Sequence, residues 1–156
     1  MLSALPLLLV IVYTYFALPH ALNLRIPPFV AGAIAMSLFT AALVAEIVRA
    51  GILAVPRGIV EAAESQGFAG TPIMRMIVLP IALRNMMPAL ISQFVTLLKD
   101  TSLTAIITIP ELLGRAQIVY AAPPFQPLPV FGLVAVMYFV VNYSISQAGR
   151  RLEART

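Results

Sequence analysis

The sequence contains no cysteine and a single histidine, and only 10% of its 156 residues are charged. The lack of cysteine excludes a thiol nucleophile and an iron–sulfur cluster, and one histidine argues against a zinc site built from Cys and His. We therefore expect no metal and no cofactor. A soluble globular domain carries about 25% charged residues. A chain with so few charges has no means of keeping its apolar surface out of water as a soluble protein.

Apolar residues are abundant instead, at 61% of the chain with a mean hydropathy of +0.98. Such a composition is typical of an integral membrane protein. The net charge of +4 does not indicate a nucleic-acid partner. The arginines flank apolar stretches, where topology rules and anionic lipid account for them.

The apolar stretches predict an all-α unit over residues 1–156 with no internal repeat and no domain boundary. A helical crossing needs about 20 apolar residues. Four crossings are predicted, at about 2–19, 27–48, 84–105 and 130–147.

The third predicted crossing contains an adjacent pair of opposite charges, Lys99 and Asp100. Charged side chains at bilayer depth cost about 2.5–3.5 kcal/mol on insertion scales, so they normally face a protein or water-filled interior. We expect the pair to lie inside the outer part of this crossing. The alternative is a crossing that ends at Leu98, with the pair at the external surface.

One polar segment interrupts the apolar pattern. Residues 59–66 contain neither Gly nor Pro and are rich in good helix formers, and Ile59, Val60 and Ala63 recur at helical spacing. Gly67 is suited to end the helix, and Thr71 and Pro72 are suited to begin another. The pattern predicts a short helix at about 58–67, then a corner, then a new helix. On these residues alone, an amphipathic helix lying in the membrane interface remains an alternative.

Arginines concentrate around this polar segment, and the positive-inside rule places it in the cytoplasm. The C-terminal tail is also basic and is expected on the same side, which two later crossings allow. The arginines of the segment are Arg49, Arg57, Arg75 and Arg84, and those of the tail are Arg150, Arg151 and Arg155.

The polar segment resembles the signature loop of the permease subunits of ATP-binding-cassette importers. The matching residues, at the family's spacing, are Glu61, Ala62, Ala63, Gly67, Ile77, Leu79 and Pro80. The resemblance implies a type I importer-like helical bundle in the bacterial inner membrane, with segment 58–67 as the coupling helix. It also implies four kinds of partner: ATPase subunits, a second permease subunit as homodimer or heterodimer, an external solute-binding protein and the lipid bilayer.

Three further blocks resemble the permeases for polar amino acids such as histidine, glutamate, glutamine, arginine and opines. They are Lys99-Asp100-Thr101-Ser102-Leu103, Glu46 to Ile52 with Pro56 and Gly58, and Glu111-Leu112-Leu113. The resemblance makes Lys99, Asp100, Thr101 and Ser102 candidates for the translocation path. That subfamily usually has five spans, so this chain is expected to lack the first one.

The chain has no Gly-Lys-Ser/Thr phosphate-binding loop, so ATP hydrolysis is expected on a partner chain and not here. Two alternatives to a transporting permease stay open at this point. One is a truncated membrane protein that does not transport. The other is an intramembrane enzyme, which is disfavoured because the only histidine, His20, lies in a link between spans and no catalytic spacing recurs.

Overall fold

The computed structural model describes residues 5–153, and these residues form helices and connecting turns without any strand. The all-α prediction is confirmed. The start of the first predicted crossing (residues 2–4) and Arg155 of the basic tail lie outside the described residues. In chain order the elements are α1 (Leu7–Val12), the π-helical turn η2 (Tyr13–Ala17), α2 (Leu18–Leu22), α3 (Pro28–Leu53), α4 (Arg57–Ser65), α5 (Thr71–Ile73), the π-helical turn η3 (Met74–Val78), α6 (Leu79–Asp100), the 3-10 helical turn η4 (Thr101–Ile107), α7 (Leu112–Ala121) and α8 (Pro127–Glu153).

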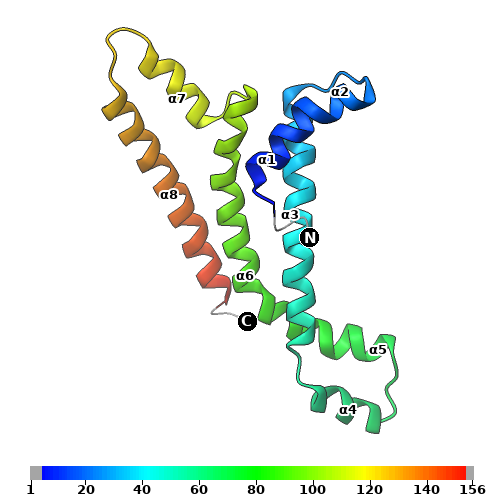
Figure 1. Cartoon of the computed structure of the whole chain (residues 1–156). Helices are drawn as coiled ribbons and strands as arrows, with labels where there is room; N and C mark the ends of the chain where they lie inside the picture. The colour runs from blue at the N-terminus through cyan, green and yellow to red at the C-terminus, as the bar shows by residue number, and fades with distance from the viewer. Residues whose placement is uncertain (1–4, 154–156) are drawn as a thin grey trace.

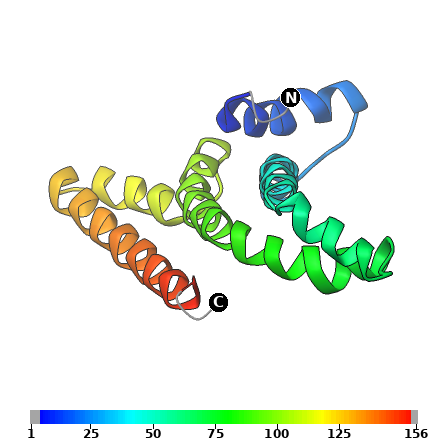
Figure 2. The ribbon, with the colours of Figure 1, turned by 90° about the horizontal axis from the view of Figure 1, so that it is seen from below.

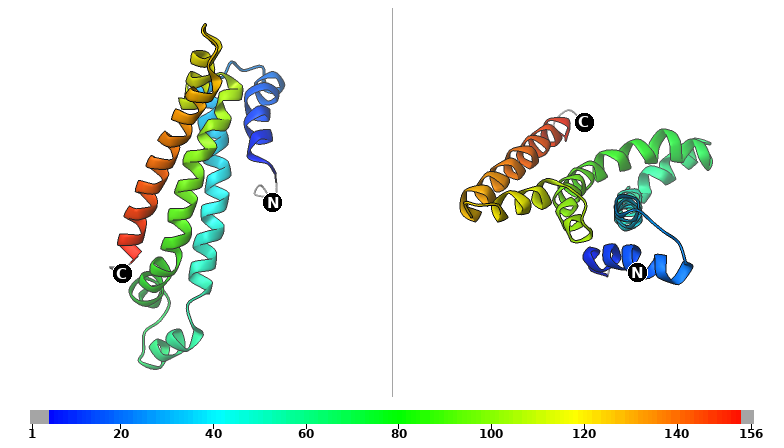
Figure 3. Two further views of the ribbon diagram at one scale, coloured as in Figure 1. Left: turned by 90° about the vertical axis from the view of Figure 1, so that its left-hand side faces the viewer. Right: turned by 90° about the horizontal axis from the view of Figure 1, so that it is seen from above.

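Three helices of the described part are long and apolar enough to cross a bilayer: Pro28–Leu53, Thr71–Ile107 and Pro127–Arg151. A fourth apolar helix, Leu7–Leu22, is shorter. The long helices run side by side, with α7 joining the far ends of α6 and α8 (Figure 1). The short helices α4 and α5 project beyond the opposite end of the bundle, as Figure 3 shows from the side.

The helix that holds the third predicted crossing is much longer than residues 84–105. It runs without a break for 37 residues, from Thr71 to Ile107. The predicted crossing starts at Arg84 because residues 71–80 contain two prolines and an arginine, which favour a boundary. The helix accommodates the prolines: Pro72 lies in the first turn of α5 and Pro80 follows the π-helical turn η3.

Small residues allow the long helices to approach one another closely. Gly51 of α3 packs against Met86 of α6, and a Cβ atom placed on Gly51 would lie 3.0 Å from the Met86 Cβ. Gly149 of α8 packs against Ile91 of α6 even more tightly. In lipid, where no hydrophobic effect drives helices together, such close van der Waals contact is a main source of association. α6 is therefore the central helix, with α3 on one side and α8 on another (Figure 2).

The α3–α6 contact continues into a buried cluster at the end of the bundle that carries α4. Its buried members are Val55, Ala63, Ile73, Val78, Ala82 and Met86. A second cluster, at the other end, holds the N-terminal helix against α3 and η4 through Leu7, Ile11, Ala35 and Ile107. The first cluster thus extends from the membrane spans into the projecting helices, and it provides the structural base of the site described next.

Candidate functional site

The helix α4 begins and ends at defined positions. Pro56 precedes it in an extended conformation, and Gly67 ends it with a φ of +87°. The amide of Gly67 donates to the carbonyl of Glu64 (2.9 Å), and the amide of Phe68 donates to the carbonyl of Ala63 (3.2 Å). These two bonds form a Schellman C-terminus, which a glycine in the left-handed region makes possible. The predicted helix and its glycine stop are confirmed.

The corner after α4 differs in one detail from the prediction. The sequence predicts Thr71 as the cap of the next helix, but Thr71 is its first helical residue, and Gly70 precedes it with a φ of +50° and a ψ of −109°. The amide of Met74 donates to the Gly70 carbonyl at 3.2 Å. The turn requires a backbone conformation that only glycine adopts readily. Gly70 therefore occupies the N-cap position in place of Thr71, and no side chain caps this helix.

α4 is held on the ends of the long helices by one apolar face. Ala63 is buried among Val55, Ile73 and Val78, and Val60 is half-buried beside it. Ile59, which is predicted on the same face, is exposed instead. Glu61 and the small side chain of Ala62 lie outside this buried face, and both are exposed. The buried cluster that holds Ala63 contains Val55, which follows α3, Ile73 of α5 and Val78 of η3, so α4 packs against the ends of both long helices.

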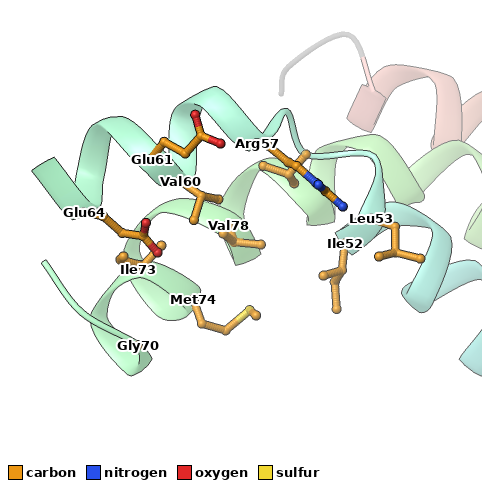
Figure 4. A pocket seen from close by; sticks show the side chains of 11 residues that line it. Ile52, Leu53, Arg57, Val60, Glu61, Glu64, Gly70, Ile73, Met74 and Val78 are labelled. Atoms are coloured by element: carbon orange, nitrogen blue, oxygen red, sulfur yellow. The ribbon is translucent and has the colours of Figure 1, made fainter.

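A groove of about 500 Å³ lies between α4 and the helix ends below it. Its floor is apolar, and its charged rim carries Glu61 and Glu64 from α4 and Arg57 from the start of that helix (Figure 4). All three charged side chains are exposed, and the exposed hydroxyl of Ser65 donates to the Glu61 carbonyl (2.9 Å). An apolar groove with a rim of exposed charges is suited to receive part of another protein.

Leu79 and Pro80 stand where η3 passes into α6. Proline inside a helix removes one hydrogen bond and clashes with the carbonyl four residues earlier, and a π-helical turn relieves both problems. The same arrangement occurs at Leu18-Pro19, which directly follows the turn η2. The Leu-Pro pair therefore lets one continuous helix connect the groove to the membrane interior.

The four candidate path residues lie at the end of α6 remote from α4, where α6 passes into η4. Their hydroxyl groups bond to the helix itself: Thr101 donates to the Leu98 carbonyl (2.6 Å) and Ser102 to the Lys99 carbonyl (2.7 Å). Asp100 is half-buried and Lys99 is exposed. Within the described residues, Lys99 alone of the four lines a groove between α6 and α8. The four candidate path residues are therefore consecutive at the junction of α6 and η4, but they do not line a common cavity.

Two features of this region were not predicted, although Glu111 belongs to one of the blocks that resemble amino-acid permeases. Glu111 caps α7 by accepting hydrogen bonds from the amides of Leu113 (2.8 Å) and Gly114 (2.5 Å), and the Tyr138 hydroxyl of α8 donates to it at 3.4 Å. The second feature is the groove between α6 and α8. The spacing of Ser92, Thr96 and Lys99 on one helix face indicates a polar stripe, but the partner helix could not be inferred from it.

Long apolar helices, with the short helix α4 packed outside them against a continuous span that contains the Leu-Pro pair, define the membrane-spanning permease of a type I ATP-binding-cassette importer. The chain belongs to the family described as binding-protein-dependent transport system inner membrane components, and the match to this family covers residues 1–156.

Proteins of similar sequence are also named as permease subunits of this kind. The chain is 46% identical over 153 residues to the probable glutamine ABC transporter permease protein GlnP of Bacillus subtilis, covering 97% of this chain and 70% of that protein. It is 37% identical over 151 residues to the glutamine transport system permease protein GlnP of Escherichia coli K12, covering 96% and 68%. The predicted resemblance to amino-acid permeases is confirmed.

The solved structures agree on the fold. The crystal structure of an amino acid ABC transporter with histidines superposes with a TM-score of 0.92 at 32% identity, covering 99% of this chain and 72% of that one. An inward-facing methionine ABC transporter, MetNI, superposes with a TM-score of 0.79 at 22% identity, covering 99% and 70%, which supports the fold alone. The chain is a multi-pass membrane permease subunit and not an enzyme. Its family implies an ATPase and other subunits as partners.

Proposed function

We propose that this chain is a membrane subunit of an importer that moves polar amino acids, glutamine among them, into a bacterial cell, driven by ATP hydrolysis on a separate ATPase. The observation that carries the proposal is the seating of α4: Ala63 fixes it to two spans while Glu61 and Glu64 stay exposed. Relatives named as glutamine permeases supply the substrate class.

In this proposal α4 is the coupling helix. The exposed residues Glu61, Ala62 and Gly67 form the contact with the ATPase, and the buried Ala63 holds α4 against the spans. Leu79 and Pro80 carry the movement of α4 into α6. Closure of the ATPase dimer moves α4, and the buried cluster of Val55, Ala63, Ile73 and Val78 tilts the spans with it. A second permease subunit completes the path, and a solute-binding protein delivers the substrate from outside.

The proposed topology places α4 and the C-terminal tail in the cytoplasm and the bundle in the inner membrane as one four-span unit. The arginine-rich end of the molecule supports this orientation. The path is proposed to pass Lys99, Asp100, Thr101 and Ser102. Polar groups at that depth are expensive unless a polar partner or water faces them, and a polar substrate is such a partner.

A charge reversal at the rim of the α4 groove tests the proposal. Glu61→Lys should abolish amino-acid uptake in the assembled importer, or lower it at least about tenfold, because it places a cation at the proposed ATPase contact. Membrane insertion should be unchanged, since Glu61 is exposed and outside the buried cluster. Uptake is measured in a strain that lacks its own permease, together with co-purification of the ATPase.

Gln66→Lys provides the matched control, because Gln66 is exposed on the same loop but does not line the groove. It adds a positive charge while leaving the rim intact, so uptake should stay near the wild-type rate. Normal uptake by the Glu61→Lys variant would rule out α4 as the coupling element. No uptake by the wild-type chain would favour the non-transporting alternative.

A further inference from the structure

We infer that the groove between α6 and α8 is a carboxylate-binding subsite that favours neutral and acidic amino acids over cationic ones. The inference rests on the proposed function and narrows its substrate class. The groove has a volume of about 350 Å³. Its lining residues are Pro88, Ile91, Ser92, Val95, Thr96 and Lys99 of α6, and Ser146 and Arg150 of α8.

The geometry brings two cations to one groove. α8 runs antiparallel to α6, and Gly149 packs directly on Ile91, which places the neighbouring Arg150 beside the middle of α6. Lys99 lies about two turns further along α6. The Cα–Cβ bonds of a helix tilt toward its N-terminus, so the Lys99 side chain leans back toward the level of Arg150. Both side chains are exposed and line the same groove.

Among the side chains that the structure describes, a set that leaves out Glu153, no carboxylate contributes to the lining of the groove. Asp100 follows Lys99 in sequence, but successive helical residues are about 100° apart around the axis, and Asp100 is not part of the lining. Two like charges that face one space repel each other unless an anion joins them. The groove is therefore expected to attract an anionic group.

Hydroxyl groups complete the site. Ser92, Thr96 and Ser146 line the groove between the two cations. The Thr96 hydroxyl donates to the Ser92 carbonyl (3.0 Å), so its oxygen is left as an acceptor. A zwitterionic amino acid can place its carboxylate on Lys99 or Arg150 and its ammonium group on such oxygens. A guanidinium or lysine side chain would add a third cation, with no carboxylate of the described lining to pair it.

The test is direct binding to the purified permease–ATPase complex in lipid nanodiscs, without the solute-binding protein, which would impose its own selectivity. Glutamine, glutamate and arginine are compared by calorimetry. The wild-type complex should bind glutamine and glutamate at least about tenfold more tightly than arginine. Lys99→Gln and Arg150→Gln should each weaken glutamine and glutamate binding at least about tenfold, or about 1.4 kcal/mol. Lys99→Arg should retain most of the affinity.

Two matched controls separate the groove from general effects. Arg115→Gln removes one positive charge from an exposed position of α7 outside the groove and should leave binding unchanged. Ser146→Leu fills the groove and should abolish binding, whereas Ser144→Leu should not. Ser144 is an exposed residue of the same helix whose hydroxyl donates to the Val140 carbonyl, away from the groove.

The outcomes distinguish this inference from the proposal on which it rests. Wild-type affinities that Lys99→Gln, Arg150→Gln and Ser146→Leu all leave unchanged would overturn the subsite while leaving the importer intact. Equal binding of arginine and glutamine would overturn the selectivity. The variants could instead lose co-purified acidic phospholipid while their affinity for amino acids stays unchanged. That result would overturn the subsite and show that the groove binds a lipid head group. A wild-type complex that binds none of the three would count against amino-acid transport itself.

Discussion

Gly149 is the residue at which α8 approaches α6 most closely. A Cβ atom at this position would lie 2.5 Å from the Ile91 Cγ2 atom and 2.9 Å from its Cδ1 atom. Gly149→Ala should therefore push the two helices apart and destabilise the bundle by about 1–3 kcal/mol, as overpacking of a close contact does. The measurement is the denaturation midpoint of the purified chain in detergent.

Gly132→Ala is the control, because Gly132 lies on the same helix and a Cβ atom there would have no neighbouring atom within 4 Å. This substitution should be neutral or slightly stabilising, since alanine has the higher helix propensity. Combining Gly149→Ala with Ile91→Ala should restore part of the lost stability, because the second change opens space for the first. A Gly149→Ala variant as stable as Gly132→Ala would show that the contact is looser than described.

Sequence reasoning could not have found this contact. Five small residues in the second predicted crossing, Ala31, Gly32, Ala33, Ala35 and Ser37, are expected to allow close helix packing. Ala31, Gly32 and Ala35 are buried, whereas Ala33 and Ser37 are exposed. Gly149, however, lies beyond the last predicted crossing, which ends at about residue 147. α8 continues to Glu153 because residues 147–153 contain no proline and Gly149 is held by its contact with Ile91, whereas the sequence-based limit follows hydropathy alone.

At the scale of elements, a substitution in the Leu-Pro pair after η3 should impair coupling to ATP hydrolysis without lowering thermal stability. Pro80→Ala restores the missing amide donor and removes the steric cause of the π-helical turn, so the helix can become regular. Removing a π-helical bulge takes one residue out of the turn and rotates α5 and α4 about the helix axis. Thermal stability should stay equal or rise, while substrate-stimulated ATP hydrolysis by the assembled importer should fall at least about tenfold.

Pro19→Ala changes the equivalent position after η2, at the other end of the molecule from α4. ATP hydrolysis in this variant should remain coupled to substrate, because η2 lies outside the connection between α4 and α6. Equal loss of coupling in both variants would mean that proline substitution disturbs the whole bundle. Full coupling in the Pro80→Ala variant would mean that the π-helical turn does not set the position of α4.

The same region shows what a sequence can and cannot specify about an element. The helix at 58–67 and its stop at Gly67 were predictable because both follow from local propensity and a single glycine. The continuity of Thr71–Ile107 was not, because prolines and charges near its start are normal signals of a helix boundary. The burial of Val78, Ala82 and Met86 against α3 overrides those signals.

At the scale of the whole molecule, most residues of the three spans are not buried by other helices of this chain. Only 17%, 22% and 11% of the residues in the three apolar windows are buried. Large apolar side chains remain exposed, with Leu128 at 85% and Phe29 at 72%. A soluble core of this size would not be stable with so little burial, so the remaining surface must face lipid or other subunits.

The absence of cysteine makes the orientation of the molecule directly measurable, because any introduced cysteine is the only thiol. Ala21, Ala69 and Ala122 are exposed, and the bundle separates Ala69, between α4 and α5, from Ala122, between α7 and α8. With the arginine-rich end in the cytoplasm, Ala69→Cys should react with an impermeant maleimide only in inside-out vesicles. Ala21→Cys and Ala122→Cys should react only in intact cells.

Labelling of Ala69→Cys in intact cells would place α4 outside and remove the proposed contact with a cytoplasmic ATPase. The three positions also test the number of crossings. Reaction of Ala21→Cys from the same side as Ala69→Cys would mean that α3 does not span the membrane, although its window is the most apolar of the three, with a hydropathy of 2.0. Reaction on the expected sides, in a complex that still transports, would establish the orientation on which the coupling of α4 to the spans depends.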